Sequence, residues 1–264
     1  MAISTFDQYI ASQKQLIAFK KTASLTTVAQ MISSVFQQAG VPGAGTLAGT
    51  STTAGVVPTD ATAGFPPVNA FQGGAKGYIT RASCYNDRAC TLYLVDVLWK
   101  GGAYPYNANV TLSGQPSFSS RVPGGTDYTG TEIWLEQVTA MTGNQSIRIT
   151  YLDQDGDAGD TGTIATGVAP IVSRCYPVPL ASGDVGVQRI DSVVSTVSTA
   201  GTFNVLVVRP LLIMRIPGAG TGFDMDMLRT GMPEVFADSA LAVYVRPDST
   251  ASGVPEVYFE IANG

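Results

Sequence analysis

An acidic segment, Asp153–Asp160, has the residue types and spacing that could most directly do chemistry. Carboxylates two residues apart can converge on a hard cation such as Ca²⁺, which takes several oxygen ligands. Compared with a calcium loop of the helix–loop–helix type, Ala158 replaces the expected glycine and Ile164 replaces the bidentate glutamate. Asp and Gly are also common turn residues, so we interpret the segment as a turn between two strands. Calcium binding remains the alternative for its aspartates, Asp153, Asp155 and Asp157.

Paired carboxylates are the other route to catalysis, because the chain has no histidine. Ser-His-Asp and Cys-His nucleophile systems and HExxH metal sites are therefore excluded. Glu132 and Glu136 share one parity of a predicted strand, and Asp127 lies nearby, so a glycosidase-type pair can be drawn. A solvated strand face is the plainer interpretation. We expect no catalytic residue, no cofactor, no metal site and no enzyme activity.

The cysteines predict buried thiols. There are three of them, Cys84, Cys90 and Cys175, and an odd number argues against a framework made only of disulfides. Without histidine they cannot complete a four-ligand zinc site. Three buried thiols in a reducing compartment are expected, with a Cys84–Cys90 bridge across a turn as the alternative.

One glycine-rich segment, Gly43–Ala48, matches the GxGxxA form of the dinucleotide fingerprint. That fingerprint needs a strand before it and a helix after it, so that the pyrophosphate meets a helix N-terminus. Here a predicted helix precedes the motif and a Gly- and Thr-rich segment follows it. We therefore expect no dinucleotide site.

An aromatic segment on Gly- and Pro-rich loops could form a recognition surface. Its members are Tyr104, Tyr106, Phe118 and Tyr128. Exposed rings can stack on a sugar, but aromatic residues are also enriched in protein–protein interfaces. Given the low charge of the chain, the interface interpretation is favoured over carbohydrate binding.

Two helices are predicted near the N-terminus. Thr5 and Gln8 have the spacing of a capping box, and apolar residues recur at helical spacing to about Phe19. From Val28 to Ala39, apolar residues again repeat at i, i+3, i+4 and i+7, and Gly40 and Pro42 end the pattern. This second helix is the most clearly patterned one.

From Lys76 onward the chain reads as β-structure. The candidate strands are 77–83, 91–99, 110–112, 132–138, 146–152, 161–164, 187–194, 202–208, 211–216, 241–245 and 257–261. They are rich in β-branched and aromatic residues, are separated by Gly, Pro, Asn and Asp, and alternate in polarity where antiparallel strands would be half-buried. Strands do not alternate with long helices, so a parallel α/β sheet is not expected. The predicted fold is mainly β: an antiparallel β-sandwich, with the jelly roll as one version, preceded by a helical and extended arm.

Charge is scarce, and most of all in one segment. Only 13% of the 264 residues are charged, against about 25% in an ordinary soluble domain. Asp60 is the only charged residue between Thr22 and Ala75. Apolar residues interleave with Gly and Pro there, which indicates an extended arm that lies on its own β-domain or on a neighbouring subunit. We therefore divide the chain into a helical segment (1–40), a low-charge arm (41–76) and a β-sandwich (77–264).

Composition also bears on partners and location. The net charge of −5 and the absence of a basic patch predict no nucleic acid partner. Because no run of 18 apolar residues occurs, no membrane partner is expected. The N-terminus has no signal-peptide pattern, which predicts synthesis in the cytoplasm.

Six segments together resemble structural proteins of tailed-bacteriophage virions. The resemblance lies in their overall residue pattern and in their order, and it spans nearly the whole chain. The segments are ISTFDQYIASQK, GVVPTDATAGFPPVNAF, TDYTGTEIWLEQVTAMTGNQSIRITYLDQDG, CYPVPLASGDVGVQRIDSV, AGTFNVLVVRPL and GMPEVFADSALAVYVRPDSTASGVPEVYFEIANG. No catalytic or ligand-binding motif is among them.

The resemblance implies a capsid cement or decoration protein on the virion surface, made in the host cytoplasm. Such proteins tie neighbouring subunits of the major capsid protein together with a β-sandwich and an arm, often as trimers. Its expected partners are thus the major capsid protein and further copies of itself. A tail or head-fibre protein, or a carbohydrate- or receptor-binding module, is the alternative.

Overall fold

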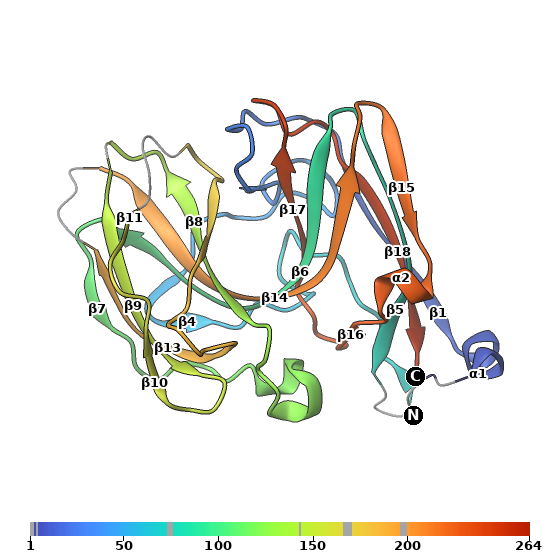
Figure 1. Ribbon diagram of the computed structural model, residues 1–264, viewed down its shortest axis with the longest axis horizontal. Helices are drawn as coiled ribbons and strands as arrows, with labels where there is room; N and C mark the ends of the chain where they lie inside the picture. Colours follow the sequence, from blue (N-terminus) through green and yellow to red (C-terminus); the bar gives the residue numbers. More distant parts are fainter. Residues whose placement is uncertain (1–2, 4, 73–75, 143, 166–170, 196–199) are drawn as a thin grey trace.

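Two long antiparallel strands, β6 (Cys90–Pro105) and β14 (Thr202–Ile216), run through the molecule and organise its fold (Figure 1). The computed structural model describes residues 3, 5–72, 76–142, 144–165, 171–195 and 200–264. Within these residues the strands form three antiparallel sheets, and the helices are short. The predicted class, mainly β with a sandwich core, is confirmed.

The sheets are named here by their position. The terminal sheet has the order β15-β5-β18-β1-β3, with β16 also on β5. The central sheet has the order β12-β8-β14-β6-β17-β2, with β4 also on β6, and the distal sheet has the order β10-β9-β13-β7, with β11 also on β9. The remaining elements are α1 (Phe6–Ala11), β1 (Lys14–Lys21), β2 (Ser33–Ser34), β3 (Gly40–Val41), β4 (Ser51–Val56), β5 (Gly77–Asn86), β7 (Asn109–Thr111), η2 (Ser119–Arg121), η3 (Pro123–Gly125), β8 (Glu132–Thr139), β9 (Ser146–Asp153), β10 (Ala158–Asp160), β11 (Ile164–Ala165), β12 (Cys175–Val178), β13 (Val187–Ser195), β15 (Thr221–Met225), α2 (Met227–Thr230), β16 (Glu234–Val235), β17 (Leu241–Pro247) and β18 (Glu256–Asn263).

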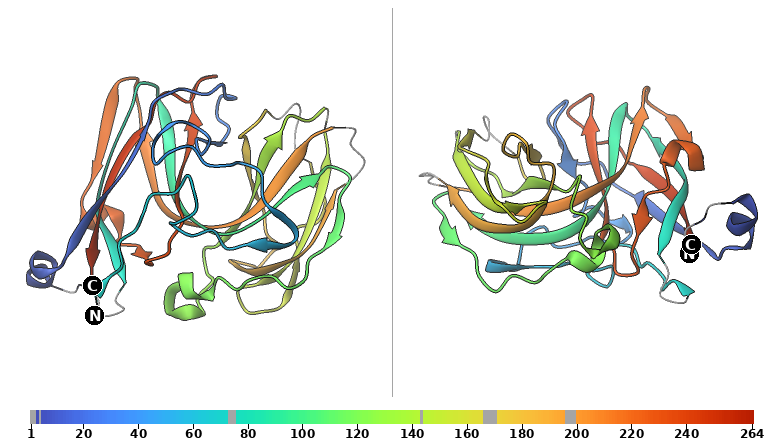
Figure 2. Two further views of the ribbon diagram at one scale, coloured as in Figure 1. Left: turned by 180° about the vertical axis from the view of Figure 1, so that it is seen from behind. Right: turned by 60° about the horizontal axis from the view of Figure 1, so that its bottom comes forward.

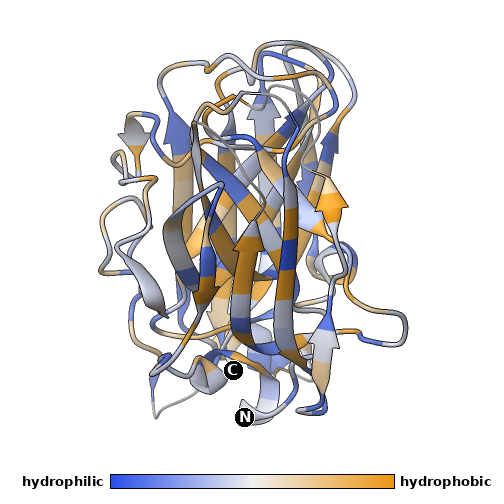
Figure 3. Cartoon of the chain, turned by 90° about the vertical axis from the view of Figure 1, so that its left-hand side faces the viewer, coloured by the Kyte–Doolittle hydropathy of each residue, from blue (hydrophilic) through white to orange (hydrophobic). Residues whose placement is uncertain are grey.

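The central sheet takes part in two sandwiches. Leu92, Leu94 and Met214 pack against the terminal sheet in one hydrophobic core. Farther along the same strands, Leu98 and Val205 pack against the distal sheet in a second core. Register shifts in the β6–β14 pairing accompany this change of partner. Hydrophobic and hydrophilic residues alternate along strands of the distal sheet, as expected when one face is buried (Figure 3).

The low-charge segment covers the other face of the central sheet. Ile32 and Phe65 are buried against Val95, Trp134 and other residues of that face, in a third apolar cluster. Figure 2 (left), which views the molecule from behind, shows the segment crossing in front of the central sheet. Its one carboxylate, Asp60, accepts a hydrogen bond from the backbone N–H of Val68 at 2.9 Å. Of the two surfaces left open by the sequence, the arm therefore lies on its own β-body.

A buried charged cluster lies on β6 and β14 between the two sandwich cores. Asp96 pairs with Arg121 of η2 and with Arg209 of β14, and it accepts a hydrogen bond from the hydroxyl of Ser239 at 2.8 Å. Arg121 also donates to the carbonyl of Val97 at 2.8 Å and to that of Pro58 in the arm. Both carboxylate oxygens of Asp96 are therefore paired, which buried charges require.

The predicted strands agree well with the observed ones. Eight of the predicted ranges coincide with β5, β6, β7, β8, β9, β13, β17 and β18 to within a few residues or are extended by them. The two ranges 202–208 and 211–216 are one strand, β14, which passes Arg209 and Pro210 through a register shift. The range 161–164 overlaps the two-residue β11 only at Ile164.

The helix predictions were largely wrong. The capping box is present, since Thr5 and Gln8 bond reciprocally, but α1 ends at Ala11 and β1 replaces the rest of the predicted helix. The segment Val28–Ala39 contains no helix, and β2 lies in its middle. There Ile32 packs against the central sheet while Val35 joins the core between the central and terminal sheets, so tertiary contacts override the helical spacing.

All three cysteines are buried free thiols, as predicted, and Cys84 and Cys90 form no bridge. Burial raises the pKa of Cys84 to about 12 and that of Cys90 to about 11. In the part of the chain that the structure describes, no helix is long and apolar enough to cross a membrane.

Candidate functional site

The acidic segment forms the turn of the β9–β10 hairpin, as the turn interpretation predicts. Asp153 accepts hydrogen bonds at 2.9 Å from the backbone N–H groups of Asp155 and Asp157, so one of its oxygens holds the turn. Asp160 pairs with Arg148. No group of three or more His, Cys, Asp or Glu residues within the described ranges is arranged to hold a metal ion.

The solvated strand face predicted for Glu132 and Glu136 was wrong for Glu136, which is only 2% exposed. Its carboxylate accepts a hydrogen bond from the Asn204 amide at 2.9 Å and lies 3.5 Å from the Lys100 ammonium. Glu132 accepts a hydrogen bond from the indole N–H of Trp134 at 2.7 Å. The arm covers the face of β8 that carries both glutamates, so this face is not solvated as predicted. Each carboxylate has a different hydrogen-bond partner.

The aromatic segment was also predicted wrongly as a surface. Tyr104, Tyr106 and Phe118 are buried in the core between the central and distal sheets, and the partly buried Tyr128 packs against that core. The Tyr106 hydroxyl donates to Gln137 at 2.5 Å, and its ring lies 4.7 Å from that of Phe203. These rings are therefore core residues, which removes the residues on which both the interface and the sugar-binding interpretations depended.

The terminal sheet has an open strand edge at β1. β3 pairs only with Lys20 and Lys21, so Lys14–Phe19 has no strand on that side among the described residues. The backbone N–H of Lys21 donates to Pro255, so odd-numbered residues of β1 bond toward β18. The backbone groups of Leu16 and Ala18 consequently point away from β18, toward the open edge.

A shallow groove runs along this edge. It has a volume of about 440 Å³, and its walls are β1 on one side and Val41, Pro42, Pro66 and Pro67 on the other. Proline has no N–H to offer a neighbouring strand. The groove is therefore apolar on its far wall and carries free backbone hydrogen-bonding groups on its β1 wall.

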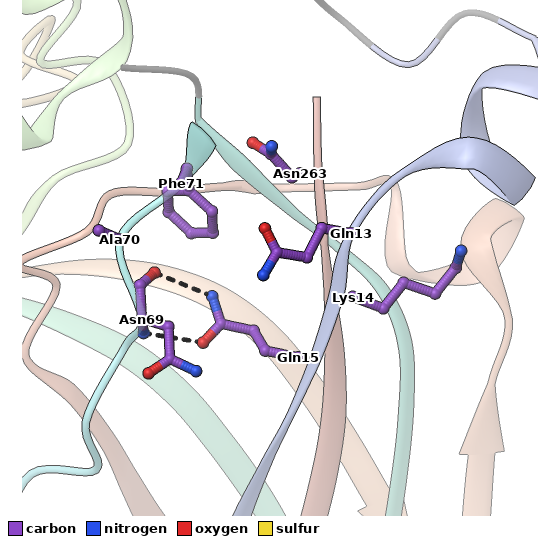
Figure 4. A pocket seen from close by; sticks show the side chains of 7 residues that line it. All are labelled: Gln13, Lys14, Gln15, Asn69, Ala70, Phe71 and Asn263. Atoms are coloured by element: carbon purple, nitrogen blue, oxygen red, sulfur yellow. Dashed lines mark hydrogen bonds between the residues drawn. The ribbon is translucent and has the colours of Figure 1, made fainter. Parts of the chain in front are cut away.

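Gln15 of β1 holds the arm in place beside the groove. Its side-chain amide donates to the carbonyl of Asn69 at 3.2 Å and accepts from the Asn69 backbone N–H at 2.9 Å, as a paired strand would (Figure 4). Phe71 and Asn263 line the small cavity beside this pair, which holds about 30 Å³. The side chain thus holds the arm next to β1 without using the backbone edge of β1.

Lys21 anchors the end of the groove. It is 2% exposed, and its ammonium donates to the carbonyls of Gln38 at 3.1 Å and Pro42 at 3.0 Å. Burial lowers the pKa of Lys21 from 10.5 to about 8. Below pH 8 the folded protein therefore keeps Lys21 charged, and this lowers the free energy of unfolding.

This lowered pKa predicts a pH dependence of stability. Between pH 8 and 10.5 the unfolded chain binds this proton more strongly than the folded chain, so stability rises with pH across that window, by at most about 3 kcal/mol. We expect the rise to be missing in Lys21→Met, as measured by urea denaturation at several pH values. The control Lys20→Met removes an exposed lysine and keeps the rise. Parallel curves for wild type and Lys21→Met would contradict the assignment.

Two short helices flank the outer face of the terminal sheet. Tyr9 of α1 and Met227 and Arg229 of α2 line one hollow with Arg81 and Asp224. No residue of α1 is buried, and the helix is attached by the Tyr9 hydroxyl, which donates to Glu260 at 2.8 Å. Lys14 also donates to the carbonyl of Tyr9, at 2.7 Å. Figure 1 shows α1 projecting from the body.

Sequence reasoning missed this surface because it expected a helix across β1 and no strand at β15. The sequence carries no clear signal for it, because Leu16, Ile17, Ala18 and Phe19 are all apolar, and the two-residue period appears only in their burial.

Comparison with known proteins gives no family. No family model matches the chain, and no curated protein matches it. Among solved structures, the chain is similar to one described as the structure of infectious bursal disease virus Gx strain, with 10% identity and a TM-score of 0.21, over 95% of this chain and 81% of that chain. It is likewise similar to the crystal structure of the infectious bursal disease virus VP2 subviral particle, with 10% identity and a TM-score of 0.18, over 96% and 81% of the two chains. TM-scores of this size carry no argument about function.

Proposed function

We propose that this protein is a structural component of a virus particle, and specifically a capsid cement or decoration protein of a tailed bacteriophage. The observation that carries the proposal is the outer surface of the terminal sheet. It combines an unpaired strand edge with an apolar groove and two short helices that expose apolar side chains. An unpaired edge is a template for pairing with another chain, and exposed apolar surface marks sites of association.

The proposed partners are the major capsid protein and further copies of this chain, with a trimer as one arrangement. Its mechanism is stabilisation of the shell by buried surface, without turnover, because mass action across many contacts favours the assembled state. The double sandwich supplies a rigid body for that role. The resemblance of the sequence to tailed-phage virion proteins supports the choice of particle, and the proposed location is the capsid surface.

A tail or head-fibre protein is the remaining alternative. The carbohydrate-binding version loses its support, since Tyr104, Tyr106 and Phe118 are buried.

The copy number of the chain in purified particles tests the proposal. Gel densitometry against the major capsid protein is expected to give a ratio close to one for a cement protein. A few copies per particle would overturn the cement role in favour of a vertex, tail or fibre position. Absence of the chain from purified particles would overturn the virion role itself.

A further inference from the structure

The two edges of the terminal sheet differ, and their chemistry is complementary. β1 is the open edge on one side, and β15 is the last strand on the other. In the all-antiparallel order β15-β5-β18-β1, β15 runs opposite to β1. A neighbouring copy that placed its β15 beside β1 would therefore continue the antiparallel pattern. The open stretch Lys14–Phe19 is long enough to pair with the five residues of β15.

Charge alternates strand by strand across the outer face of this sheet. From one edge to the other, the outward charges are Lys14 and Lys20 on β1, Glu256 and Glu260 on β18, Arg81 on β5 and Asp224 on β15. Opposite charges on adjacent strands stabilise a sheet, and like charges destabilise it. The next strand beyond β1 should therefore be acidic, and the next strand beyond β15 should be basic. The acidic β15 edge of one copy therefore suits the basic β1 edge of another copy.

Asp224 is available for such a contact. It is exposed, and its carboxylate has no hydrogen-bond or ion-pair partner among the residues described. It lies on the outer face because it pairs with Ser83, while its neighbours Phe223 and Met225 pack against the core. β1 pairing with another β1 is disfavoured, because antiparallel pairing about Ile17 would place Lys14 opposite Lys20 of the other copy.

The helices at the two edges add a second, apolar contact. α1 precedes β1 and α2 follows β15, so antiparallel pairing brings α2 of one copy to the end of β1 where α1 lies. Leu228 of α2 is 88% exposed, and Phe6 and Ile10 of α1 are 65% and 60% exposed. Both helices lie on the outer face. The contact would cover these side chains together.

We propose that the terminal sheet is continuous from copy to copy, with β15 of one copy paired to β1 of the next. Such a head-to-tail contact leaves one free edge at each end, so it leads to a ring or a filament rather than to a closed two-fold dimer. The inference deepens the proposed assembly role and rests on it, and it names the partner at this surface as a second copy of the chain.

Charge reversal at the two edges tests the contact. Wild-type protein is expected to form oligomers whose mass rises with concentration in sedimentation velocity. In the register that sets Asp224 opposite Ala18, Ala18→Glu places an acid opposite Asp224, and Asp224→Lys places a base diagonal to Lys20, so each should weaken association by at least about tenfold. The double variant Ala18→Glu with Asp224→Lys should recover part of the association, since it places an acid opposite a base at these two positions while Lys14 and Lys20 remain. The controls Ala18→Lys and Asp224→Glu should keep wild-type association.

Leu228→Asp tests the helical contact separately. Leu228 is 88% exposed, so this substitution should leave the fold intact. It should also weaken association. The contact is overturned by a wild type that is monomeric at every concentration, by single variants that associate as wild type does, or by a double variant that stays dissociated. The copy number in particles is unaffected by these outcomes, so it tests the virion role independently.

Discussion

Arg121→Met is expected to lower the free energy of unfolding by about 3–5 kcal/mol, because it breaks a fully buried ion pair and leaves one charge behind. Arg121 donates hydrogen bonds to Asp96 and to the Val97 carbonyl in the central sheet. It also donates to the Pro58 carbonyl in the arm. The variant leaves Asp96 with only Ser239 and the more distant Arg209, at 3.7 Å. Urea denaturation followed by circular dichroism measures the loss.

Two further variants make this result specific. Arg121→Lys keeps the charge but loses the planar fork, so it should lie between Met and wild type. Arg189→Met breaks the exposed pair with Asp191 and should change stability by no more than about 1 kcal/mol. An Arg121→Met variant as stable as Arg189→Met would show that the buried charged cluster around Asp96 does not support the fold.

Phe65→Ala should cost about 3–5 kcal/mol of unfolding free energy. The Phe65 ring is buried on the central sheet and lies 4.8 Å from the ring of Phe36. Removing it leaves a hole next to the cavity of about 240 Å³ that both rings already line with Lys100. Because this ring fastens the low-charge segment, limited proteolysis should also find new cleavage sites between Thr22 and Phe71.

Val185→Ala is the matched control, since it shortens an apolar side chain that is 52% exposed and lies outside the proposed contact, and it should stay within about 0.5 kcal/mol of wild type. It should create no new cleavage sites. Wild-type protein that is already cut between Thr22 and Phe71 as fast as Phe65→Ala would contradict the packing of this segment on its own body.

Strands could be predicted from the sequence wherever one face of the sheet is buried and the other is not. β9 shows this in Ile147, Ile149 and Tyr151, which alternate with partly or fully exposed residues. β14 was predicted as two strands because Arg209 and Pro210 interrupt its apolar run. The interruption exists because Arg209 pairs with Asp96 where the two sandwiches meet, and only the tertiary structure reveals that partner.

The N-terminal region could not be predicted in the same way, because distant contacts decide its local structure. Ser33 and Ser34 pair with Val245 and Tyr244 of β17, more than 200 residues away. These contacts and Gln30, which has a positive φ of 62°, replace the helix that the spacing of Val28, Met31 and Ile32 favours. Helical periodicity reports which residues are apolar, but it does not report that they pack against different sheets.

The candidate site was the least predictable part of the molecule. An open edge is defined by the strand that is missing beside it, so Leu16 and Ala18 look ordinary until the sheet order is known. The charge alternation joins residues from both ends of the chain, such as Lys20 and Glu256, which lie 3.1 Å apart. The same holds for Asp224, whose strand, β15, is not among the predicted ones.

The passage of β6 and β14 through both sandwiches has a mechanical consequence. The low-charge segment also passes from β3 to β4 and back to β5, so tension applied between the two halves is shared by its backbone, by the backbones of β6 and β14, and by the hydrogen bonds between those two strands. Neither half can be excised or exchanged as a separate module, because each would end in the middle of its own sheet. The protein should therefore respond to load as one stiff body that yields in a single step.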